Sequence, residues 1–305
     1  MTEANPSNHK TIYDYIRAEL SREQPPQIMA ATNSVMKRFE GHVAGVLFYG
    51  SCLRTGEFED KILDFYIIVD DYKSAYPSWI LGALNKVIPP NVYYDEFDFE
   101  GIKIRSKFAV LSLNDYIYRT SKDCLNISVW ARFSQPSALV YFVNDRANEA
   151  LTNATSNAVE TMISATIPML KEELTSRELW AGAFSLTYSA ELRSEKPGKG
   201  FELYELDKVR YDELTLLLNK ELDGVGRSRG TEKLKWVFRR LNGKFVSFMR
   251  LLKATFTFDG GIDYLAWKIS RHSGFEVEIT PWQRKHPILG GVSLFWKLRK
   301  KGAFR

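Results

Sequence analysis

The stretch VLFYGSCLRTGEFEDKILDFYIIVDDY, residues 46–72, decides the fold that we expect for this chain. It contains two short β-rich runs, separated by a loop that holds a glycine. The first run ends in Gly50-Ser51, and Asp64 stands near the start of the second. We therefore predict two strands whose ends bring a glycine-serine turn and a carboxylate together.

The sequence on either side of this stretch predicts an α+β fold. Strands are expected at Val43–Tyr49, Ile62–Val69, Val92–Phe99, Ile102–Leu113 and Leu139–Val143, the third and fourth forming a hairpin around Glu100-Gly101. Helices are expected twice within residues 10–40, once within 71–89, and at Ala147–Ile167, Ser176–Leu192, Lys208–Leu222 and Lys233–Leu252. This order predicts a mixed sheet with helical cover.

The change from strand-like to helical periodicity near residue 147 suggests a division into three regions. We expect a mixed-sheet domain over 1–146, a helical domain over 147–255 with a polar loop at 194–200, and a basic, aromatic segment over 256–305.

Composition excludes several classes of protein. The 305 residues are 45% hydrophobic and 26% charged, which is a globular composition and not that of a disordered or fibrous chain. Two cysteines are too few for a disulfide framework or a structural zinc site. No apolar run reaches the roughly 18 residues of a membrane span, and the N-terminal residues lack the pattern of a signal peptide. We expect a cytoplasmic chain.

The net charge of +5 is unevenly distributed. Residues 231–305 hold 16 Lys and Arg against 5 Asp and Glu, a balance of +11, so the rest of the chain carries −6. Four of the seven tryptophans also lie in this last quarter. Basic residues mixed with aromatic ones suit an anionic surface such as a membrane or a nucleic acid. A basic helical subdomain with aromatic core residues would give the same composition.

The layout of residues 46–72 resembles that of a polymerase-β-type nucleotidyltransferase, so we expect the domain over 1–146 to be nucleotidyltransferase-like. Gly50 lets the backbone approach a triphosphate, and the Ser51 hydroxyl can hold it. Such an enzyme also needs carboxylates on an adjacent strand to hold Mg²⁺, and Asp64 is the first candidate ligand. The Cys52 thiol beside the turn has no nearby histidine, so we interpret it as a packing residue and not as a nucleophile.

A second metal ligand is harder to find in the sequence. The general pattern has an acid two residues after the first, and here that position is Tyr66. Asp70 lies about 20 Å further along the strand, too far to share the ion. The segment VYYDEFDF, residues 92–99, offers Asp95, Glu96 and Asp98, of which we choose Asp95. A solvated strand edge would explain these acids equally well.

Several blocks of the chain resemble, in family order, the mitochondrial translocator assembly and maintenance protein family of peripheral CDP-diacylglycerol synthases. These blocks, within residues 45–220, are LDFYIIVDDY at 63–72, Tyr49-Gly50-Ser51, Val92-Tyr93-Tyr94, Lys107-Phe108-Ala109-Val110, Arg132-Phe133-Ser134-Gln135-Pro136 and Leu186–Arg193. The departures include Cys52 and Ala131, each replacing a family glycine, and Gln135, replacing a family lysine. Because of these departures, a lipid phosphate other than phosphatidate stays open as the acceptor.

The resemblance implies transfer of CMP from CTP to phosphatidate, giving CDP-diacylglycerol and pyrophosphate, with Mg²⁺ as cofactor. The expected catalytic residues are Asp64, Ser51 and Lys107; the nucleotide-binding residues Tyr49, Gly50, Ser51, Lys107 and Arg132; the lipid-phosphate residues Tyr188 and Arg193; and the metal ligands Asp64 and Asp95. Lysine and arginine suit phosphate as a point charge and a bidentate fork, respectively.

A lipid acceptor also implies a place of action. We expect the protein to work peripherally on the inner face of a membrane, and residues 281–305, which combine Lys and Arg with Trp and Phe and hold no acid, to contact the anionic surface. No nucleic-acid partner is expected. Two alternatives stay open: a nucleotidyltransferase with a soluble or nucleic-acid acceptor, and an inactive nucleotidyltransferase fold that serves as a binding module.

Overall fold

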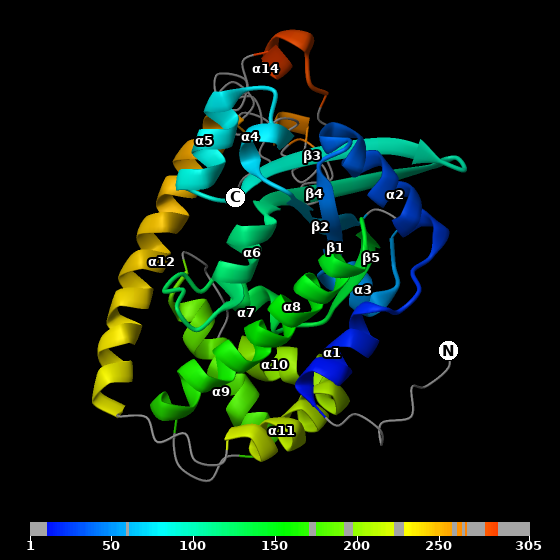
Figure 1. The fold of residues 1–305 in the computed structure, drawn as a ribbon. Coiled ribbons are helices and arrows are strands. Elements are labelled where there is room, and N and C mark those ends of the chain that lie inside the picture. Colours follow the sequence, from blue (N-terminus) through cyan, green and yellow to red (C-terminus); the bar gives the residue numbers. More distant parts are fainter. Residues whose placement is uncertain are drawn as a thin grey trace, which may run out of the picture.

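The fold is α+β, with a central five-stranded mixed sheet and helices on both of its faces (Figure 1). The computed structural model describes residues 11–58, 61–170, 175–191, 198–222, 229–257, 261–263, 266 and 278–285. Within these residues, no helix is both long and apolar enough to cross a membrane. Most of the predicted segment 256–305, including residues 286–305, lies outside the described residues.

The sheet has the strand order β3-β4-β2-β1-β5. The strands are β1 (Val43–Tyr49), β2 (Ile62–Val69), β3 (Asn91–Phe99), β4 (Ile102–Ser112) and β5 (Ser137–Phe142). Pairing is antiparallel between β1 and β2, β1 and β5, and β3 and β4, and parallel between β2 and β4. The predicted mixed sheet and the hairpin around Glu100-Gly101 are confirmed.

The helices on either side of the sheet complete the fold. They are α1 (Ile12–Leu20), α2 (Pro26–Met36), α3 (Ser51–Thr55), α4 (Tyr72–Ala75), α5 (Trp79–Val87), α6 (Leu113–Thr120), α7 (Trp130–Phe133), α8 (Asp145–Thr166), α9 (Ser176–Ser189), α10 (Lys199–Leu206), α11 (Lys208–Leu222), α12 (Arg229–Thr257) and α14 (Pro281–Lys285). Short 3₁₀ turns follow α2 and α8 at Lys37–Phe39 and Ile167–Met169. The short helices α3, α6, α7, α10 and α14 were not predicted; α3 lies where a loop was expected.

Alternation along β2 assigns the two faces of the sheet. Tyr66 and Ile68 belong to a core shared with α1, α6, α7, α8, α9 and α11. Phe65 and Ile67 belong to a second core shared with α2 and α4. Because side chains alternate between faces, Asp64 lies on the same face as Tyr66. The first core joins residues from before and after position 146, so the sheet and the helices of residues 147–255 pack around common interior side chains.

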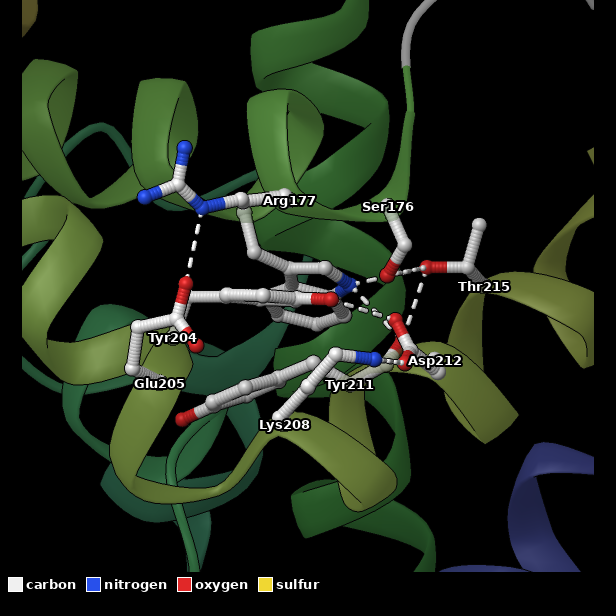
Figure 2. A network of polar contacts seen from close by, with 9 residues as sticks. Ser176, Arg177, Tyr204, Glu205, Lys208, Tyr211, Asp212 and Thr215 are labelled. Carbon is white, nitrogen blue, oxygen red and sulfur yellow. Dashed lines mark hydrogen bonds and ion pairs between the residues drawn. The ribbon is translucent and has the colours of Figure 1, made fainter.

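Polar contacts hold α9, α10 and α11 together (Figure 2). The Thr215 hydroxyl donates to Ser176 Oγ at 3.0 Å, and the Tyr204 hydroxyl donates to Asp212 Oδ1 at 2.6 Å. Trp180 donates its indole N–H to Thr215 Oγ1 at 3.0 Å. These contacts link both α9 and α10 to α11, and α10 also packs against α9. Lys199 of α10 and Tyr49 at the end of β1 line one cavity, which is described below.

One buried ion pair connects the N-terminal helix to the C-terminal half of the chain. Arg210 of α11 pairs with Glu19 of α1 through Nε–Oε2 at 2.5 Å and Nη2–Oε1 at 3.1 Å. Its Nη1 donates to the Ser134 carbonyl at 2.9 Å. Arg210 is 6% exposed and Glu19 is 2% exposed. A bidentate pair shielded in this way leaves an uncompensated buried charge when either partner is removed.

We therefore expect Arg210→Met to lower the free energy of unfolding by about 3–5 kcal/mol, because Glu19 stays buried without its partner. The matched control is Arg177→Met, which breaks the exposed Arg177–Glu205 pair of 2.7 Å and costs about 1 kcal/mol or less. Urea unfolding measures both changes. Equal losses in the two variants would contradict the role given to the buried pair.

Candidate functional site

The turn after β1 and the start of β2 meet as the sequence predicted. Tyr49 pairs with Asp64 across the antiparallel ladder, so Gly50 comes directly against the carboxylate. Gly50 has a φ of +94°, and a Cβ at this position would lie 3.1 Å from Asp64 Oδ2. The positive φ therefore favours glycine, and the close approach of Asp64 leaves little room for a Cβ.

Lys107 completes this arrangement from the neighbouring strand β4. It is the register partner of Asp64 in the parallel β2–β4 ladder, and its Nζ lies 2.9 Å from Asp64 Oδ1. Both side chains are partly exposed, at 33% for Lys107 and 23% for Asp64. The structure thus brings together the three predicted catalytic residues: Ser51 two residues after the end of β1, Asp64 near the start of β2, and Lys107 in the middle of β4.

Arg132 of α7 lies on the same side of the sheet, with its guanidinium 4.9 Å from the centre of the Tyr49 ring. Phe133, the next residue, packs against the rings of Tyr49 and Tyr66 at 5.9 and 5.1 Å. Burial tends to lower the pKa of Arg132, but the nearby tyrosines and the carboxylates of Asp64 and Glu191 raise it overall. The guanidinium therefore remains charged and is positioned to bind an anion.

Two cavities adjoin at this place. The smaller, of about 320 Å³, is lined by the Gly50-Ser51 turn together with Arg54, Gln135 and Lys199. The larger, of about 490 Å³, contains Asp64 and Lys107 in its wall and is closed on another side by α12. The two cavities share four lining residues, Tyr49, Ser128, Arg132 and Glu191. Their common wall thus lies beside the predicted catalytic residues.

Cations outnumber acids around both cavities. The smaller one has Arg54, Arg132 and Lys199 against Glu191. The larger one adds Lys107 and two cations of α12, Arg250 and Lys253, against Asp64 and Glu191. Three of these cations are already paired with acids, Arg54 with Asp207 at 2.7 Å, Lys199 with Glu202 at 2.9 Å and Lys107 with Asp64 at 2.9 Å. A ligand phosphate would have to compete with these carboxylates for the cations.

The α12 cations are held by backbone carbonyls of the turn between α5 and β3. Arg250 donates from Nε to the Pro89 carbonyl at 2.7 Å and from Nη1 to Ser128 Oγ at 3.0 Å. Lys253 donates to the carbonyls of Ile88 and Pro90, at 2.5 and 2.8 Å. Burial, reinforced by the charge of Arg250, lowers the pKa of Lys253 to about 7.

The choice of Asp95 as a second metal ligand was wrong. Asp95 pairs with Ser106, which in turn pairs with Leu63, so all three lie on the face opposite Asp64. Its carboxylate accepts a hydrogen bond of 2.6 Å from Ser34 of α2. The two carboxylates are therefore separated by the sheet. Among the described residues, no group of three or more His, Cys, Asp or Glu side chains could hold a metal.

Three residues from the sequence analysis remain: Tyr188, Arg193 and Cys52. Tyr188 of α9 lines the smaller cavity, so it lies beside the predicted nucleotide residues. Arg193 lies outside the described residues. Cys52 is 1% exposed and donates to the Ile62 carbonyl at 3.3 Å, and burial raises the pKa of its thiol. This agrees with a packing role for Cys52.

Sequence reasoning missed several cavity residues, namely Arg54, Glu191, Lys199, Arg250 and Lys253. Arg54 stood within the quoted stretch, three residues after Ser51, and a helical turn starting at Ser51 would have suggested it. Its Nη2 donates to Gln135 Oε1 at 3.0 Å. Nothing local marks Arg250 or Lys253, because they reach the site only through the packing of α12.

Comparison with known proteins adds nothing to this geometry. No protein-family model matches the chain, and no curated protein matches it.

The lowered pKa of Lys253 gives the larger cavity a pH-dependent charge. Because Lys253 changes from mostly protonated to mostly neutral between about pH 6 and about pH 8, its attraction for anions falls as the pH rises. We expect the affinity for sulfate, whose charge is constant over this range, to fall up to about tenfold. Calorimetric titration measures it. Lys253→Arg, which stays charged, is the control; an unchanged pH dependence in this variant would contradict the assignment to Lys253.

Proposed function

We propose that this chain is a cytidylyltransferase that moves CMP from CTP to phosphatidate or a related lipid phosphate, releasing pyrophosphate. The observation that carries the proposal is the position of Asp64, between the Gly50-Ser51 turn and Lys107, at two adjoining cation-rich cavities. Transfer between two phosphate-bearing substrates needs two anion-binding spaces that meet at the reacting phosphorus. The choice of CTP and of a lipid acceptor comes from the resemblance of the sequence blocks.

The two cavities suggest a division of the substrates. The triphosphate suits the smaller cavity, where Arg54, Arg132 and Lys199 surround the Gly50-Ser51 turn. The acceptor phosphate suits the larger one, beside Arg250 and Lys253. An acceptor oxygen then attacks the α-phosphorus of CTP as the bond to pyrophosphate breaks. Because this oxygen is already anionic near neutral pH, the protein supplies positioning and charge neutralisation and needs no nucleophile of its own.

The described residues of the site supply one carboxylate ligand for Mg²⁺. Asp64 is a partly exposed carboxylate on the cavity wall and would be its protein ligand. Mg²⁺ commonly uses one or two carboxylates together with substrate phosphates and waters, so a single carboxylate is compatible with binding alongside CTP. The bound ion would neutralise charge on the phosphates, while Lys107 would be released from Asp64 to interact with the same oxygens.

The alternatives from the sequence predict different behaviour. A nucleotidyltransferase with a soluble or nucleic-acid acceptor would have the same cation-rich cavities but would not prefer a lipid phosphate. An inactive binding module would bind CTP without releasing pyrophosphate. One observation favours the inactive module: Tyr66 stands where a second acid is expected, and its ring packs against Tyr49 and Phe133. A peripheral position on the inner face of a membrane belongs to the proposed lipid activity.

Asp64→Ala is expected to reduce the release of pyrophosphate from CTP in the presence of phosphatidate at least about a hundredfold, because it removes the proposed metal ligand. The fold should be retained, since the side chain is partly exposed. Asp95→Asn is the matched control on the opposite face and should leave the rate within about twofold of wild type. The rate is measured with a coupled pyrophosphatase assay.

Two outcomes would contradict the proposal. The first is an Asp64→Ala variant that keeps a rate within about tenfold of wild type. The second is a wild-type protein that binds CTP yet releases no pyrophosphate with any member of a panel of lipid phosphates, which would favour the binding module.

A further inference from the structure

Helix α12 exposes its apolar side, whereas a surface helix usually turns that side toward the protein core. Its outward side carries large apolar residues with exposed fractions between 50% and 64%, and these residues are Leu234, Val237, Phe238, Leu241, Phe245 and Phe248. The spacing of three and four residues places them on one stripe, which we call the α12 apolar face. Figure 1 shows α12 running along one side of the molecule. At 29 residues, the helix is about 43 Å long.

The inward side of α12 is fixed by polar contacts. Glu232 is 2% exposed and pairs with Lys235 at 2.9 Å and with Arg239 at 3.3 Å. Trp236 donates its indole N–H to the Ala165 carbonyl at 2.8 Å. The pairs of Glu232 lie within α12, whereas the Trp236 contact, with those of Arg250 and Lys253 near the other end, joins the helix to other elements and sets its rotation about its axis. The exposure of the apolar stripe therefore follows from the way the helix is anchored.

The middle of the helix is fixed as closely as its ends. A Cβ on Gly243 would lie 2.2 Å from the Ala190 carbonyl oxygen, so α12 approaches the end of α9 at a distance that only glycine allows. Asn126 donates to Asn242 Oδ1 at 3.0 Å on the same side. A helix anchored along its length in this way has no freedom to turn its apolar stripe inward.

We propose that the α12 apolar face is a docking surface for an anionic lipid bilayer. The charge of the helix identifies the occupant, because α12 contains eight Lys and Arg and one acid, the buried Glu232. Lys233, Arg240 and Lys244 are exposed cations of this helix. Phenylalanine and leucine with flanking cations are typical of helices that lie in the plane of a membrane surface. A second copy of this chain would bring like charges together across the same interface.

The docking surface is continuous with the larger cavity. Leu251, which follows the apolar face along the helix, is 64% exposed and also lines the cavity that contains Asp64. Val87, next to the Ile88 carbonyl that anchors Lys253, is 77% exposed. A lipid phosphate could thus place its head group beside Arg250 and Lys253 while its acyl chains remain at the apolar face. This route rests on the proposed function; the docking itself does not.

Vesicle flotation of the full chain tests the docking. With vesicles of equal parts phosphatidylglycerol and phosphatidylcholine, wild type should float. The double variant Phe245→Glu, Phe248→Glu should bind on the order of a hundredfold more weakly, because two large apolar groups no longer enter the bilayer. The matched control is Val209→Glu, Leu216→Glu on α11, whose side chains are 69% and 66% exposed. It should float like wild type, and thermal unfolding confirms that both double variants fold.

A second measurement locates the contact directly. Cys52 and Cys124 are buried, so Phe245→Cys can be labelled selectively with an environment-sensitive fluorophore. Its emission should shift to the blue on addition of the same vesicles, whereas the label on Val209→Cys should not respond. Equal flotation of wild type and the α12 variant, no flotation of wild type, or a wild-type dimer that Phe245→Glu disperses would each overturn the proposal.

The outcomes also separate the docking from the proposed function. Asp64→Ala should float like wild type, because Asp64 is not on the docking surface. The α12 double variant should keep its rate on a short-chain, water-soluble phosphate and lose it on long-chain phosphatidate in vesicles. Flotation of wild type without any transfer would contradict the proposed function alone. Transfer to the short-chain phosphate without any flotation would contradict the docking alone.

Discussion

The antiparallel pairing of β1 with β2 places the last residue of one strand opposite Asp64 of the next, and every other feature of the site is arranged around this contact. Gly50 follows at once with a φ of +94°, which favours glycine, and a Cβ there would lie only 3.1 Å from the carboxylate. The parallel pairing of β2 with β4 then sets Lys107 beside the same carboxylate. Since parallel strands require a crossover, α4, α5 and β3 intervene between them in the chain, and the turn of residues 88–90 that anchors α12 belongs to this crossover.

Sequence patterns located the strands well, because uninterrupted apolar runs bounded by turn residues have few other interpretations. They did not determine which face a polar residue occupies at a sheet edge. In residues 92–99, acids and aromatics stand on both faces, so a shift of one residue in the assumed register moves Asp95 from one face to the other. The hydrogen bond with Ser34 and the pairing with Ser106 give it a structural role on the α2 face.

The same limit applies to the cations of the site. Lys107 was predicted from the family resemblance of its sequence block, and the strand register then places it beside Asp64. Arg250 reaches the cavity from about 190 residues away in sequence by helix packing alone. Helix propensity and periodicity predicted most of α12 but gave no orientation. The short helices α7 and α10 have too few residues for a periodic signal, although α7 positions Arg132 and α10 contributes Lys199.

The contacts of α12 with the rest of the protein give a physical reason for its outward-facing apolar stripe. A periodic apolar stripe on a surface helix ordinarily faces the protein core, because burial removes apolar area from water. Here the side of α12 that faces the protein is held by the buried Trp236 and by hydrogen bonds from Arg250 and Lys253 to the carbonyls of residues 88–90. Because these contacts fix that side of the helix against the protein, the apolar stripe lies outside. The cations of α12 that line the larger cavity and the exposed apolar stripe are therefore two consequences of one helix orientation.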